Sequence, residues 1–240
     1  MRRFSSNLVT IVASLAACAA HAQMAGPMSG RPSGPQPSEA IQITPNPDKP
    51  ELAARKAYNA GVKSVNKAKE LEAAAAKATS PDKKASALEK ANDALNKALD
   101  QFTEALTNQS DMYEAWNYAC YVHRHLGAYA ESLDDCNHAL ELKPDNVTAI
   151  EYRGEAYLGL NRLADAKAAY MDLFNHARDL ADQLMAAMRQ WLGDHRQNAG
   201  GVGNADLDGF DHWVQERDGI AKQAASLGVD APVRGGASPR

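Results

Sequence analysis

The chain is poor in the residues on which many active sites depend. Its 240 residues include three cysteines, no Cys-x-x-Cys-His haem motif, and only 6% aromatic residues. We find no glycine-rich phosphate loop, paired-carboxylate site or nucleophile beside a base in a recognisable context. The net charge of −4 leaves no basic excess for nucleic acid. We therefore expect a chain that is not an enzyme and has neither a cofactor nor a nucleic-acid partner.

Long hydrophobic runs are also missing, and the longest apolar stretch, residues 8–20, is too short to span a bilayer stably. It follows Arg2 and Arg3, so residues 1–22 are typical of an export signal. Ala20-His21-Ala22 suits ordinary cleavage and release into the periplasm. The alternative is that residues 15–18 form a lipobox, so that lipidated Cys18 anchors an outer-membrane lipoprotein facing the periplasm. We expect membrane contact only through such a lipid.

Proline is scarce except near the N-terminus, where residues 23–50 hold seven of the eleven prolines. This stretch has little to bury and is expected to be a disordered linker. Residues 228–240 are expected to be a disordered tail. The globular part is then residues 51–227, in which alanine is abundant and suits close packing of helices.

Residues 113–180 hold two consecutive copies of a 34-residue unit. Shifting the sequence by 34 places Tyr118 on Tyr152, Leu126 on Leu160 and Cys136 on Tyr170. A fixed period of this length indicates stacked helix pairs, because one pair cannot cover its own apolar face.

The units, 113–146 and 147–180, resemble the tetratricopeptide repeat (TPR). The matches lie at the aromatic, small-residue, turn and proline positions of its pattern: Trp116, Ala139, Pro144, Gly154, Tyr157, Ala166 and Tyr170. Departures include Cys120 at position 8 and Arg178 at position 32, where the pattern has glycine and proline. The resemblance implies an all-α, TPR-type right-handed helical-hairpin solenoid.

The same register extends toward the N-terminus, where Phe102 occupies position 24 and its partner glycine is Gly61. These are 41 residues apart instead of 16, and the predicted turn at Ser80-Pro81 lies midway, with Ser80 as N-cap. We therefore expect residues 51–108 to form an elongated first hairpin, with an irregular helix pair as the alternative.

Residues 180–227 are expected to form a degenerate repeat or capping hairpin, joined to the second unit by a continuous or kinked helix. Residues 204–209 match the start of a calcium loop. They span the end of the expected loop 193–206 and the start of the last helix. The match is incomplete, because Gln215 occupies the position where a bidentate Glu is needed. Capping of a helix by acidic residues explains this stretch more simply.

Cys120 and Cys136 are placed opposite each other by the hairpin, because their midpoint falls in the turn at residue 128. Helices in contact bring such Cα atoms within disulfide range, so we predict this bond, with two buried thiols as the alternative. His123 and His125 near these cysteines point in different directions on a helix, so we expect no metal site.

The resemblance also implies a concave binding face lined by the first helix of each repeat. The candidate peptide-binding residues on it are Asn117, Tyr118, Tyr121, Arg124, Glu151, Tyr152 and Glu155. Tyrosines beside carboxylates suit an extended segment with basic and apolar side chains. The alternative is that these residues are ordinary solvated helix faces.

We therefore expect a non-catalytic adaptor or scaffold of the bacterial cell envelope that captures a segment of another protein on this face. The alternative is a self-assembling structural envelope protein whose hairpin 51–108 packs on a second copy.

Overall fold

The computed structural model describes residues 49–197 and 200–228. The expected signal peptide, Cys18 and nearly all of the linker 23–50 lie outside the described residues, as does nearly all of the tail 228–240. No helix of the described part combines the length and apolar character needed to cross a membrane.

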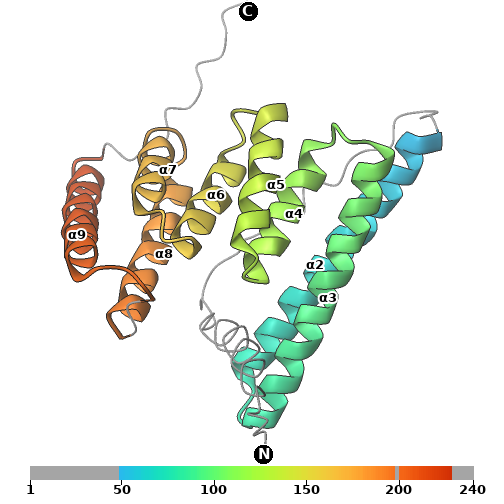
Figure 1. The fold of residues 1–240 in the computed structure, drawn as a ribbon, viewed down its shortest axis with the longest axis horizontal. Helices are drawn as coiled ribbons and strands as arrows, with labels where there is room; N and C mark the ends of the chain where they lie inside the picture. The colour runs from blue at the N-terminus through green and yellow to red at the C-terminus, as the bar shows by residue number, and fades with distance from the viewer. Residues whose placement is uncertain (1–48, 198–199, 229–240) are drawn as a thin grey trace, which may run out of the picture. The chain divides into compact units, whose positions relative to one another are not determined.

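The described residues form eight α-helices and no strand, which confirms the all-α array of helical hairpins (Figure 1). The helices are α2 (Lys49–Lys77), α3 (Pro81–Asn108), α4 (Tyr113–His125), α5 (Tyr129–Leu142), α6 (Val147–Gly159), α7 (Leu163–His176), α8 (Arg178–Gln197) and α9 (Asn204–Ser226).

The two central hairpins repeat at 34 residues, because α6 and α7 begin and end 34 positions after α4 and α5. Their turns are built alike: Gly127 has φ 77° and Asn161 has φ 58°. In each hairpin the backbone N–H that follows this residue donates a hydrogen bond back to a carbonyl of the first helix. The distance is 2.9 Å from Ala128 N to His123 O and 2.8 Å for the corresponding pair of the second hairpin. Glycine and asparagine both tolerate this left-handed conformation, so each sequence can end its helix there.

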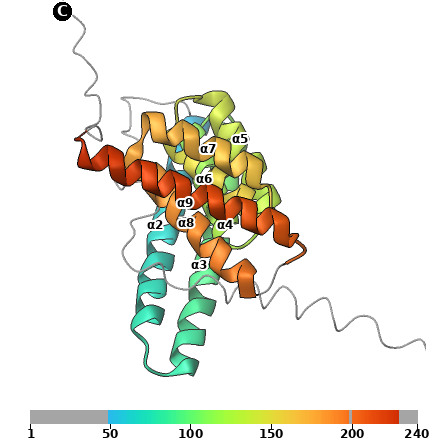
Figure 2. The same ribbon diagram turned by 90° about the vertical axis from the view of Figure 1, so that its left-hand side faces the viewer.

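The first hairpin is elongated, with 29 residues in α2 and 28 in α3. Figures 1 and 2 both show these helices side by side. Pro81 opens α3 as expected, but the Ser80 side chain makes no capping hydrogen bond. Gly61 permits the close approach: a Cβ atom there would lie 2.4 Å from the Phe102 ring.

The C-terminal helices differ from the sequence-based expectation at two points. The chain breaks at Ala177 (φ −151°, ψ 79°), so α7 and α8 are separate helices and not one continuous or kinked helix. Residues 204–209 lie within α9, behind Gly203 at the N-cap position, so the expected loop ends earlier. A calcium loop wraps its oxygens around the ion, which helical backbone does not permit, and these residues instead form the start of the helix.

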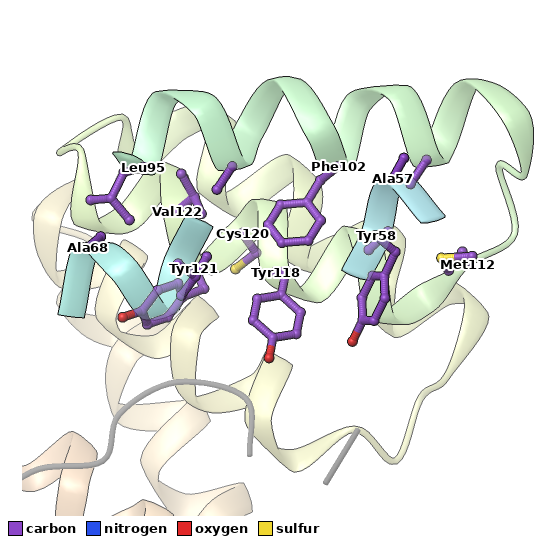
Figure 3. Close-up of a cluster of buried hydrophobic side chains, with 14 of the residues drawn as sticks. Ala57, Tyr58, Ala68, Leu95, Phe102, Met112, Tyr118, Cys120, Tyr121 and Val122 are labelled. Atoms are coloured by element: carbon purple, nitrogen blue, oxygen red, sulfur yellow. The ribbon is translucent and has the colours of Figure 1, made fainter. Parts of the chain in front are cut away.

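The core of the first two hairpins is built around aromatic rings (Figure 3). Tyr118 stacks on Phe102 at 5.1 Å between ring centroids and meets Tyr58 edge-on at 5.7 Å. The hydroxyl groups of Tyr58 and Tyr118 lie on the side of the cluster away from α3 (Figure 3). A second core around Tyr170, Leu184 and other residues joins α6–α9.

The contact at Gly61 gives a direct test of the elongated hairpin. We expect Gly61→Ala to lower the free energy of unfolding by about 1–2 kcal/mol, because overpacking against Phe102 outweighs the better helix propensity of alanine. Gly219→Ala is the matched control, since nothing lies within 4 Å of its added Cβ. It should raise stability by up to about 1 kcal/mol. Urea unfolding measures both, and equal stabilisation by the two substitutions would contradict the close packing.

Candidate functional site

The side chains with the most unusual environment gather where α2, α4 and α6 face one another. This inner cluster consists of Lys69, Glu72, Asn117, Tyr121, Arg124, His125, Glu151, Tyr152 and Glu155. Asn117, Tyr121 and Arg124 share one face of α4, because they are spaced four and three residues apart. Tyr118, also predicted to bind peptide, instead packs against Tyr58 and Phe102 in the core.

Arg124 is the centre of the inner cluster. Its guanidinium carbon lies 5.5 Å from the centroid of the Tyr121 ring and 5.1 Å from that of Tyr152, within cation–π range. The two rings are themselves 5.5 Å apart. Arg124 Nη1 also donates a hydrogen bond to Glu155 Oε2. The structure thus brings together four of the predicted binding residues.

Helix α2 contributes two residues that sequence reasoning missed. Lys69 Nζ lies 5.2 Å from the centroid of the Tyr121 ring, and Glu72 Oε1 lies 3.7 Å from His125 Nδ1. Both stand on the extra turns by which α2 exceeds a normal repeat helix. The length of the predicted hairpin could have identified them, since those turns have to pass the next repeat.

Burial and neighbouring charges set the ionisation of the inner cluster. Burial alone would lower the pKa of Arg124, but the carboxylates of Glu155 and Glu151 outweigh it and raise the pKa above its usual value. Burial also raises the pKa of Tyr121 and Tyr152. The arginine therefore stays charged and the tyrosines keep their protons, so all three can donate hydrogen bonds near neutral pH.

Several buried polar atoms of the inner cluster have no hydrogen-bond partner among the described residues. They are Asn117 Oδ1, Arg124 Nε, Arg124 Nη2, His125 Nε2 and the Tyr152 hydroxyl. Because buried polar groups are nearly always paired in native proteins, such a concentration on one face calls for an explanation. The two Arg124 nitrogens are donors and the Tyr152 hydroxyl can donate, so acceptor groups would satisfy these three atoms.

The predicted binding residues are also nearly inaccessible to water. Tyr121, Glu151 and Tyr152 are each 1% exposed, and Asn117 is 2% exposed. The alternative that they form ordinary solvated helix faces is therefore wrong. That they bind a peptide stays a prediction.

The predicted disulfide is present between α4 and α5. Cys120 and Cys136 are bonded, fully buried, and 5.2 Å apart at their Cα atoms. Next to this bond the Ser132 hydroxyl donates to the Cys120 carbonyl at 2.9 Å. The bond therefore ties α4 to α5 and fixes the helix that carries Arg124.

His123 and His125 should impose opposite pH dependences on stability. The hydrogen bond that protonated His123 Nδ1 donates to Asp135 Oδ2 (2.6 Å) raises the pKa of His123, whereas burial and then Arg124 lower the pKa of His125. The stabilising charge on His123 is present below about pH 6.5 and is lost as pH rises through its folded pKa. His125 favours its neutral form, so its contribution is lost as pH falls below about 6.5.

Urea unfolding of two variants between pH 5.5 and 8 separates these effects. His125→Asn should leave a protein whose stability declines more with rising pH than that of the unaltered chain, and His123→Asn one whose stability declines less or increases. Identical pH profiles for the two variants would contradict the assignment.

No protein-family model matches the chain, and no curated protein matches it. Among solved structures, it is similar to the Arabidopsis OM64 TPR domain, with 16% sequence identity and a TM-score of 0.34. The match covers 67% of this chain and 98% of that domain.

Proposed function

We propose that the chain is a non-catalytic adaptor that holds an extended segment of another protein on the inner cluster. The observation that carries the proposal is the set of buried donors on Arg124 and Tyr152 without a partner in the described residues. Backbone carbonyls of an extended polypeptide are acceptors of the required kind. The rings of Tyr121 and Tyr152 supply apolar surface beside them.

The location we propose is the bacterial cell envelope. Two features support it: the export-type sequence of residues 1–22 and the disulfide between Cys120 and Cys136. Disulfides persist mainly in oxidising compartments such as the periplasm. Anchoring through lipidated Cys18 remains the alternative to release.

Crosslinking in intact cells tests the adaptor function. The full chain, an Arg124→Gln variant and an Arg162→Gln variant are crosslinked and isolated under denaturing conditions, and attached polypeptides are identified by mass spectrometry. Arg162 is a matched control because it lies 4.7 Å from the Tyr157 ring centroid and pairs with Asp165, but is 48% exposed. We expect the attached polypeptides to be lost with Arg124→Gln and kept with Arg162→Gln.

The double variant Arg124→Met/Glu155→Leu guards against loss of fold, since replacing a buried ion pair by apolar residues often preserves stability. It should remain folded, as judged by circular dichroism, and should also lose the attached polypeptides. Unchanged attachment in both Arg124 variants would reject the inner cluster as the binding surface.

A further inference from the structure

We propose that copies of this chain join end to end, with α9 of one copy packed antiparallel on α2 of the next. The proposal goes beyond the adaptor function and uses a different surface from the inner cluster. It rests on the packing order of the helices, on the opposite charges of the two terminal helices, and on a register that aligns their exposed side chains.

The packing order leaves each terminal helix of the described part with one uncovered side. Within the stack, the second helix of each hairpin packs on the first helix of the next: α3 on α4, α5 on α6 and α7 on α8. Short loops join these pairs, so the partners run in roughly opposite directions. Among the described helices, none follows α9 in this order and none precedes α2. A second copy can continue the order, because its α2 meets α9 as α8 meets α7.

Both terminal helices expose large apolar side chains. Leu52 on α2 is 45% exposed, Ile220 on α9 is 38% exposed, and Leu227 at the C-cap of α9 is 70% exposed. The remaining exposed large hydrophobic residue of the described part is Leu142 on α5, at 44%. Solenoid proteins need a polar outer face on their terminal repeats to stay soluble as separate copies. Here neither terminal helix has a fully polar outer face.

The two terminal helices carry opposite net charges. Helix α2 has seven basic and three acidic side chains, and it is the only helix of the described part with a net positive charge. Helix α9 has five acidic and two basic side chains. A contact between α2 and α9 therefore joins opposite charges, whereas α2 on α2 or α9 on α9 would bring like charges together. Helix α5 is also acidic, but α4 and α6 already pack on it.

An antiparallel register pairs the exposed side chains of the two helices. Leu52 and Lys63 are 11 residues apart on α2, as are Glu216 and Leu227 on α9. Eleven residues make about three helical turns, so each pair shares one side of its helix. Leu52 opposite Leu227 thus places Lys63 opposite Glu216, about 17 Å along the helices. Glu216 accepts a hydrogen bond from Arg217 at 3.2 Å, but its side chain is 50% exposed and can accept another from a lysine.

Sedimentation velocity of the full chain over a range of protein concentrations tests the assembly. A contact between two different surfaces leaves one of each free at the ends, so we expect the mean mass to rise past that of a dimer as concentration increases. Raising the salt from about 50 mM to about 500 mM should weaken the association, because the charges are exposed. Leu52→Asn should lower the association constant about tenfold. Leu142→Asn, at a nearly equally exposed side chain on α5, is the matched control and should leave the constant unchanged.

Charge reversal identifies the two surfaces. Lys63→Glu alone and Glu216→Lys alone each place like charges in the contact and should lower the association constant about tenfold. An equimolar mixture of the two variants should assemble again as alternating chains, because the two altered helices then pair with each other and the two unaltered helices do the same. Circular dichroism checks that each variant is folded.

Four results would overturn the proposal: a monomer at every concentration, association that stops at a dimer, no recovery in the mixture of charge-reversed variants, or loss of association with Leu142→Asn. The last result would place α2 on α5 of the second copy. Arg124→Gln should leave the association unchanged, because it alters only the inner cluster. Crosslinking of partner polypeptides and end-to-end assembly can therefore fail separately, and the failure of one leaves the other standing.

Discussion

Glu155→Leu should lower the free energy of unfolding by about 3 kcal/mol, because it leaves the buried Arg124 guanidinium without its hydrogen-bonded carboxylate. The side chains of Arg124 and Glu155 are 10% and 8% exposed, so solvent compensates little for the loss. Glu151 also raises the pKa of Arg124, but the hydrogen bond from Arg124 Nη1 goes to Glu155. Urea unfolding at neutral pH measures the effect.

Two controls isolate the cause of this loss. Arg124→Met/Glu155→Leu should recover most of the stability, since no unpaired charge is left buried. Asp165→Asn removes the carboxylate of an exposed pair with Arg162 and should cost less than about 1 kcal/mol. A Glu155→Leu protein as stable as the unaltered chain would show that the Arg124 charge is not buried as described.

Reduction of the disulfide should have an effect of similar size. Cys120 and Cys136 are 16 residues apart in sequence, and closing a loop of this length stabilises a fold by about 3 kcal/mol, mainly through the unfolded chain. We therefore expect dithiothreitol to lower the urea midpoint of the unaltered chain. The Cys120→Ala/Cys136→Ala variant should begin near that lowered midpoint and show no response to dithiothreitol. A midpoint of the unaltered chain that is independent of reductant would contradict a stabilising bond.

The parts of the fold that follow from local spacing could be predicted from the sequence. The 34-residue period places α4–α7, and the shift between Gly61 and Phe102 correctly predicts an elongated hairpin with close packing at the glycine. The disulfide follows from the same register, because positions at equal distance from a turn oppose each other in a hairpin. These features depend on one helix pair at a time.

Features that depend on contacts between hairpins could not be predicted in this way. The break at Ala177 has no proline or glycine to mark it, and it allows α8 to pack Leu184 against Gly154 of α6. Lys69 reaches Tyr121 only because α2 is long and lies beside α4. The burial of Tyr121 and Tyr152 likewise depends on tertiary packing. Their positions in the repeat predicted only the helix face on which they lie.

Replacing one hydroxyl tests the binding role of the inner cluster most directly. Tyr152→Phe removes only an oxygen that has no hydrogen-bond partner in the described part of the chain, so the free energy of unfolding should not fall. Tyr170→Phe is the matched control, because its hydroxyl is also buried without a described partner but lies on α7, away from the cluster. We predict that Tyr152→Phe weakens Arg124-dependent crosslinking of partner polypeptides in cells while Tyr170→Phe leaves it unchanged. Crosslinking that is equally strong in both variants would contradict the account.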